Sequence, residues 1–117
     1  MVEEIFALLN EQRNMVGAAA LEYRPDLTSA SNLRAEESSK KWSHERPNSK
    51  PFYSVDKRIY GENLARGYNN SADEFVTAWM KSETHKKNIL YPDFKGVCVG
   101  VYEKNGKLWV SLEFTYE

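Results

Sequence analysis

The end of the chain alternates apolar and other side chains on both sides of an Asn-Gly pair, and this pattern constrains the fold most. Val97, Val99 and Val101 occupy alternate positions before Asn105-Gly106. Four alternate apolar residues follow the pair, and these are Leu108, Val110, Leu112 and Phe114. Such alternation is typical of strands with one buried face, and Asn-Gly favours the tight turn of a β-hairpin. The sequence therefore predicts a C-terminal hairpin, with at least one further strand to cover an edge.

Helical periodicity predicts two helices in the first third of the chain. Apolar residues recur near helical spacing from Val2 to Met15, and this helix is expected to end before Gly17. A turn at Arg24-Pro25-Asp26 opens a second helix, over about residues 27–42, because proline is tolerated at a helix start. The expected core residues of the two helices are Ile5, Leu8, Leu9 and Met15, then Leu27, Ala30, Leu33 and Trp42.

The middle of the chain reads as a polar loop followed by two more helices. Residues 45–57 are rich in Pro, Ser, Asn and Lys, which is typical of a surface loop, and residues 58–66 predict a short strand or turn around Gly61. Ser71 and Glu74 form a capping box directly before Phe75, Val76 and Trp79, so a third helix is expected to run to about residue 82. A short helix over residues 84–90 ends before Pro92.

Length and composition restrict the functional classes. A chain of 117 residues predicts a single domain over residues 1–117. Its net charge of -1 gives no general attraction to nucleic acid or to an anionic membrane, and no apolar run approaches the ~18 residues of a membrane span. The first ten residues carry acids where a secretion signal carries basic residues. Any export signal is therefore expected to be absent from this chain.

The lone Cys98 excludes an internal disulfide and leaves the cellular compartment open. Because Cys98 alternates with valine and glycine in a predicted strand, it is expected to be packed and not reactive. A locally basic stretch gives two readings, a solvated loop face or a contact with an anionic partner. Its basic residues are Lys40, Lys41, Arg46, Lys50, Lys57 and Arg58.

A series of short motifs along nearly the whole chain resembles the CAP superfamily, which includes cysteine-rich secretory proteins, antigen-five allergens and plant pathogenesis-related proteins. The resemblance is closest to the short bacterial SCP-like members. The motifs are Leu9-Asn10-Glu11-Gln12-Arg13, Leu21-Glu22-Tyr23, Arg34-Ala35-Glu36-Glu37, Ser43-His44, Arg46-Pro47, Gly61-Glu62-Asn63-Leu64-Ala65, Trp79-Met80, His85, Asn88-Ile89-Leu90 and Gly96-Val97.

The resemblance implies an α+β fold, a three-layer α-β-α sandwich with a small antiparallel sheet and an open cleft. Matching the family motifs places His44, Glu62 and His85 at the cleft positions of the two histidines and one acid. The second acid of the fuller eukaryotic pattern falls on Ser82, with Glu83 as a conceivable replacement. Asn63 is expected to hold loop amides in place, with Gly61 and Gly67 supplying backbone freedom on either side of it.

Two imidazoles and a carboxylate that converge form a ligand set that suits zinc or another divalent cation and leaves a position for water. One hypothesis is therefore a metal-dependent hydrolase, a peptidase or an esterase, in which Glu62 is a ligand or the general base. The alternative is a polar network around Glu62 that stabilises the fold or orients a ligand, with no metal required.

We therefore interpret the chain as an exported, extracellular or cell-surface CAP domain whose cleft binds a metal ion or a small ligand. The alternatives are the hydrolase and a cell-surface module that binds a lipid, a sterol or a peptide. Neither nucleic acid nor a membrane span is expected, and a monomer is expected.

Overall fold

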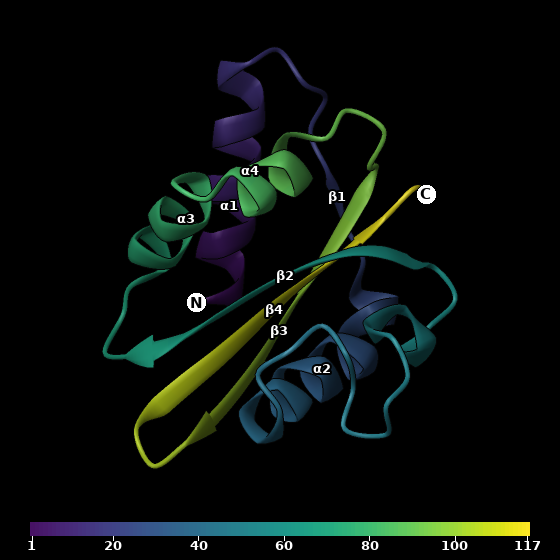
Figure 1. Cartoon of the computed structure of the whole chain (residues 1–117). Coiled ribbons are helices and arrows are strands. Elements are labelled where there is room, and N and C mark those ends of the chain that lie inside the picture. Colours follow the sequence, from purple (N-terminus) through teal and green to yellow (C-terminus); the bar gives the residue numbers. More distant parts are fainter.

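The computed structural model describes residues 1–117 and contains four helices and four strands (Figure 1). Two short 3-10 turns, Pro25–Leu27 and Phe52–Val55, accompany them. In chain order the elements are α1 (Val2–Met15), β1 (Glu22–Tyr23), α2 (Thr28–Lys40), β2 (Ile59–Tyr68), α3 (Ala72–Met80), α4 (Glu83–Leu90), β3 (Gly96–Lys104) and β4 (Lys107–Thr115).

The predicted hairpin is confirmed, and it forms the centre of the sheet. The strand order is β1-β3-β4-β2, with β4 antiparallel to both β2 and β3. At the turn between β3 and β4, Asn105 and Gly106 both have positive φ angles of 53° and 79°. Asparagine and glycine adopt this left-handed conformation at little cost, which explains the Asn-Gly pair. The sequence did not predict β1, whose two residues pair in parallel with β3.

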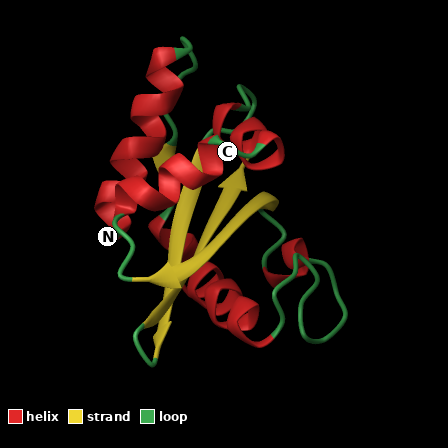
Figure 2. Cartoon of the chain, turned by 60° about the vertical axis from the view of Figure 1, so that its left-hand side comes forward, coloured by secondary structure: helices red, strands yellow, loops and turns green.

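Helices cover both faces of the sheet, as Figure 2 shows, and the expected three-layer α-β-α fold class is confirmed. Helices α1, α3 and α4 lie on one face, where the apolar row of the hairpin is buried. Five residues of that row, Val97, Val99, Val110, Leu112 and Phe114, are at most 2% exposed, and Val101 and Leu108 near the turn are partly buried. Ile5 and Leu9 from α1 and Phe75, Val76 and Trp79 from α3 complete this core, as the sequence predicts. Residue Cys98 is buried and packed, also as predicted.

Helix α2 packs alone against the other face, and it approaches β3 very closely. A Cβ atom built on Gly100 would lie 2.0 Å from the backbone oxygen of Ser31 in α2. The hydroxyl of Ser111 in β4 donates to that same oxygen over 2.7 Å. The buried residues of α2 are polar or small, and they are Ser31, Arg34, Ala35 and Ser38. The interior under α2 is therefore largely polar, beside a small apolar cluster of Leu27, Ile59 and Cys98.

Three of the expected core residues are exposed, and the prediction was wrong for them. Met15 is 71% exposed because it lies in the last turn of α1, and Leu33 is 41% exposed because α2 buries a different face. Helix α2 ends at Lys40 and not at residue 42, so Trp42 follows the helix and is 43% exposed.

The role expected for Gly61 and Gly67 was also wrong. Both lie in β2, and neither has a positive φ angle. What requires a glycine is space: a Cβ atom at position 61 would lie 2.7 Å from the ring of Phe94. At position 67 it would lie 1.9 Å from the side-chain oxygen of Asn70. These glycines therefore allow close packing of side chains against β2.

Candidate functional site

His44 follows the C-terminus of α2 and is held by a carboxylate from the sheet. Its Nδ1 atom lies 2.8 Å from Oε1 of Glu62, which projects from the middle of β2. Because an ionised carboxylate only accepts hydrogen bonds, Nδ1 carries a proton, and in this tautomer of the imidazole the lone pair lies on Nε2. Arg34 donates to the backbone oxygen of Ser43 over 2.9 Å, which fixes the chain directly before His44. The His44 side chain is 53% exposed, so its ring is open to solvent.

Arg34 and Glu62 form a fully buried ion pair beneath His44. Nε and Nη2 of Arg34 donate to the two oxygens of Glu62 over 2.8 and 2.9 Å, in the bidentate geometry that makes such pairs strong. Burial by itself raises the pKa of Glu62, but its hydrogen bonds with Glu113, Arg34 and His44 outweigh burial, and the pKa is lowered. Glu62 is therefore a carboxylate at neutral pH, and both of its oxygens are occupied.

The ion pair continues outward through the loop that follows α2. Arg34 also bonds Glu37 one turn later in α2, and Glu37 accepts three hydrogen bonds from Arg46. No role was predicted for Arg34 or Glu37, and Arg46 was expected only in a basic loop face. A possible signal was the spacing of Ser31, Arg34 and Ser38, which places small and basic side chains on one helix face.

A second glutamate lies beside Glu62, and it was not predicted as a site residue either. Glu113 of β4 is the cross-strand partner of Glu62 and is fully buried. As a carboxylate, Glu113 would be a buried charge without a hydrogen-bond partner, because no donor reaches either of its oxygens. As a carboxylic acid it can donate its own proton to Glu62. Burial and the adjacent Glu62 charge accordingly raise the pKa of Glu113 well above its usual value.

His85 lies in the first turn of α4, as predicted, and two polar side chains contact it. Asn63 bonds the α4 backbone and the side chain of Asn88, and not the loop amides expected from the sequence. The Ser82 hydroxyl lies 2.9 Å from Nδ1 of His85, and the buried side chain of Asn63 donates to the backbone oxygen of His85 over 2.9 Å. Burial, and secondarily the nearby His44, lowers the pKa of His85. The ring is therefore neutral at pH 7. When Ser82 accepts from Nδ1–H, Nε2 is left with a free lone pair.

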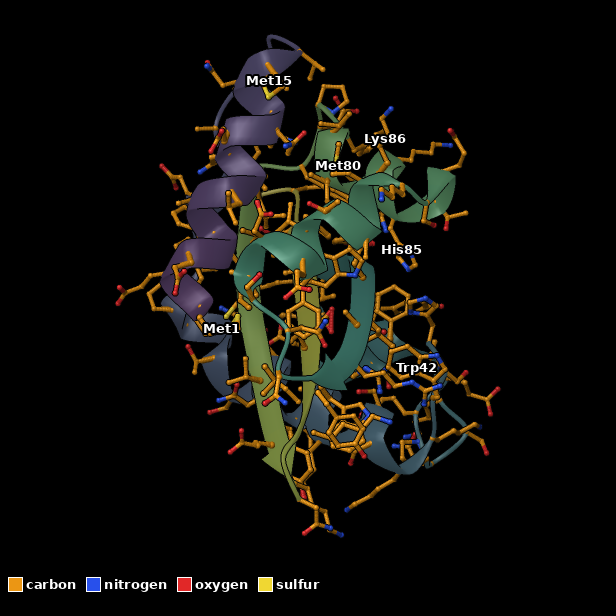
Figure 3. All side chains as sticks on the ribbon, turned by 90° about the vertical axis from the view of Figure 1, so that its left-hand side faces the viewer. Met1, Met15, Trp42, Met80, His85 and Lys86 are labelled. Atoms are coloured by element: carbon orange, nitrogen blue, oxygen red, sulfur yellow. The ribbon has the colours of Figure 1, made fainter.

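The two histidines line one hollow of about 250 Å³, together with Trp42, Ser43 and Leu64. Figure 3 shows Trp42 and His85 on the same side of the molecule. Glu62 lies behind His44 and is not part of the lining, and Glu83 lines a separate hollow on α4. No group of three or more His, Cys, Asp or Glu side chains is arranged to hold a metal ion. The three-residue ligand set expected from the sequence therefore stays a prediction.

A three-layer sandwich with one half-exposed histidine after α2 and a second in α4 defines the class of protein as an SCP-like domain. The chain belongs to the cysteine-rich secretory protein family, CAP, whose profile matches residues 6–114. It is 30% identical over 117 residues to the uncharacterized protein YkwD of Bacillus subtilis, in an alignment that covers 93% of this chain and 45% of YkwD. The chain thus spans less than half the length of this relative.

Two solved structures share the fold at low sequence identity. One is an extracellular protein containing an SCP domain from Bacillus anthracis, with a TM-score of 0.82 and 20% identity, covering 99% of this chain and 40% of the other. The second is an outer surface protein from Borrelia burgdorferi, with a TM-score of 0.72 and 16% identity, covering 98% of this chain and 92% of the other. None of the helices of the present chain is long and apolar enough to span a bilayer.

Proposed function

We propose that the hollow between His44 and His85 binds a divalent cation such as Zn²⁺, with Nε2 of each histidine as a ligand. The observation that carries this proposal is the hydrogen bond between Nδ1 of His44 and the ionised carboxylate of Glu62. A metal-ligating histidine almost always bonds a carboxylate, carbonyl or water through its other nitrogen, which fixes the ring and raises its basicity. Ser82 occupies the corresponding position behind His85.

The donor set fits a cation that is shared with a second molecule. Two neutral imidazoles suit Zn²⁺, and a tetrahedral ion held by two protein ligands has two positions left for water or for a bound ligand. Glu62 supports His44 from behind and is not itself a ligand in this proposal, because both of its oxygens are already bonded. The indole of Trp42 and the side chain of Leu64 supply apolar contact beside the two histidines.

The same geometry favours binding over hydrolysis. Glu62 is buried, so it cannot reach a substrate as the general base that the hydrolase hypothesis requires. The candidate nucleophiles do not favour hydrolysis in the hollow: the Ser43 hydroxyl accepts from the backbone of Glu45, and Cys98 is buried elsewhere. Ser82 bonds His85 but does not line the hollow. We propose that the domain works outside the cell, in keeping with the names of its structural neighbours, and that it acts through what it binds.

Zinc titration of the untagged chain tests the metal site. Because His44 and His85 are the two histidines in the sequence, every histidine ring signal in an NMR spectrum reports on this hollow. We expect one equivalent of Zn²⁺ to shift both sets of ring signals and to release or absorb heat. His44→Ala and His85→Ala should each abolish the heat, whereas Glu83→Gln should leave it unchanged. Ring signals that stay fixed at millimolar Zn²⁺ would refute the metal site.

A further inference from the structure

A second hollow continues from the histidine cleft along the outer edge of the sheet. It has a volume of about 340 Å³ and shares Trp42, Leu64 and His85 with the cleft. Its floor is the edge of β2 from Leu64 to Arg66, and its far end is formed by Asn70 and Glu74. Trp42 lies on one side of this edge, and α3 lies on the other (Figure 3). We call this hollow the β2 groove.

The floor of the β2 groove is an unpaired strand edge. β2 is the last strand of the sheet, so one side of its backbone has no partner strand. The first outward carbonyls are covered, since Asn88 donates to the oxygen of Glu62 and the indole of Trp79 donates to that of Leu64. By the alternation of an antiparallel ladder, the N–H of Leu64 and both backbone groups of Arg66 also point outward. No side-chain or loop hydrogen bond satisfies these three groups.

The walls of the groove add a cation and apolar surface. The guanidinium of Arg66 lies 4.2 Å above the Trp42 ring and forms no ion pair, so its charge is not neutralised. On the opposite side, α3 places Ala78 at the surface, above the buried rings of Phe75 and Trp79. The small side chain of Ala78 is exposed, which leaves room above the strand edge. An occupant must therefore satisfy backbone groups at strand spacing, bury an apolar surface and carry a negative charge near Arg66.

We propose that the β2 groove binds an extended peptide that adds as a strand to β2 and places an acidic side chain against Arg66. A peptide in strand conformation presents donors and acceptors at the spacing of the free groups on Leu64 and Arg66, and strand addition is an established mode of peptide recognition. Side chains of such a peptide alternate between the Trp42 wall and the α3 wall. This inference rests on the proposed function at one point: the end of the peptide near Leu64 reaches the histidine hollow.

Selection from a phage-displayed library of linear heptapeptides tests the groove. Purified full chain should enrich peptides that carry an acidic residue flanked by apolar ones. N-methylation of a selected peptide should abolish binding at alternate residues only, because every second N–H of an added strand faces β2. The amide signals of Leu64 and Arg66 should shift on binding. A library that yields no enriched sequence, or a peptide that tolerates N-methylation at every position, overturns the proposal.

A charge-matched pair of variants separates the groove from the rest of the surface. Arg66→Glu should lower the affinity for an acidic peptide by at least about tenfold, because it places like charges together. Lys104→Glu makes the same charge change on the exposed end of β3 and should leave the affinity unchanged. Equal affinities of the two variants would refute the placement of the acid.

The peptide and metal proposals fail in different ways. Each titration is run with and without Zn²⁺, on the wild type and on His85→Ala. Peptide binding that persists without any heat from Zn²⁺ removes the metal site and keeps the groove. Heat from Zn²⁺ with no enriched peptide removes the groove and keeps the metal site.

Discussion

Glu113→Gln should change how the stability of the domain depends on pH. Glu113 is fully buried, no donor reaches its oxygens, and its neighbour Glu62 is held as a carboxylate by Arg34. The folded protein therefore keeps a proton on Glu113, whose pKa is raised well above the ordinary value of 4.5. Glutamine has nearly the same volume and can donate its amide N–H to Glu62, so the variant keeps the packing and the hydrogen bond.

The sign and the size of the effect follow from proton linkage. Below pH 4.5 both the folded and the unfolded chain hold the proton. Above that pH the unfolded chain releases it and the folded chain keeps it, so the free energy of unfolding falls as pH rises towards the raised pKa. The slope approaches about 1.4 kcal/mol per pH unit. Over the two pH units between pH 5 and pH 7 this slope limits the loss to at most about 3 kcal/mol, and glutamine does not incur it.

Urea unfolding of the wild type and Glu113→Gln at half-unit steps between pH 5 and pH 7 measures this difference. Over this range the free energy of unfolding of the variant should rise relative to that of the wild type, by up to about 3 kcal/mol, because all other titrating groups are common to both proteins and cancel. Glu103→Gln removes an exposed acid from β3, and its free energy of unfolding should follow the same pH dependence as that of the wild type. Parallel curves for Glu113→Gln would show that Glu113 is ionised in the folded state, and our account of the buried pair would be wrong.

Three further substitutions test the supports of the site. Arg34→Met leaves the Glu62 carboxylate buried without its cation, so the free energy of unfolding measured in urea should fall by about 3–5 kcal/mol. An unchanged urea midpoint would contradict a buried ion pair. Gly100→Ala places a methyl group 2.0 Å from the backbone of Ser31 and should lower the free energy of unfolding by more than about 3 kcal/mol. A variant of native stability would mean that α2 can move outward. Ser82→Ala removes the hydrogen-bond partner of Nδ1 of His85. The free energy of unfolding should change by less than about 1 kcal/mol, while the Zn²⁺ affinity should fall about tenfold. An unchanged affinity would mean that Ser82 does not orient the ring.

Local patterns in the sequence predicted the elements that lie on the apolar side of the sheet. The alternation around Asn105-Gly106 and the capping box at Ser71 are short-range features, and both are present as expected. The burial of Phe75 and Trp79 follows from their helical spacing in the same way. These predictions succeed because the period of apolar residues depends on geometry within a single element.

Helix α2 shows where this reasoning fails. Its buried face is made of Ser31, Arg34, Ala35 and Ser38, so an apolar periodicity points to the wrong side and selects Leu33 as a core residue. Charged residues are buried here because they satisfy one another across elements, which no local period records.

The sequence by itself determined the hairpin, the capped helix and the positions of two histidines next to helix ends. The family motifs predicted one cleft for His44, Glu62 and His85, although the two histidines are 41 positions apart in the sequence. Only the tertiary structure decided that Glu62 lies behind His44, and that Arg34 and a protonated Glu113 hold it there. The physical reason is that alternation tells which residues share a face of a strand. Whether water or a helix covers that face depends on contacts between distant segments, here the close approach of Ser31 to Gly100.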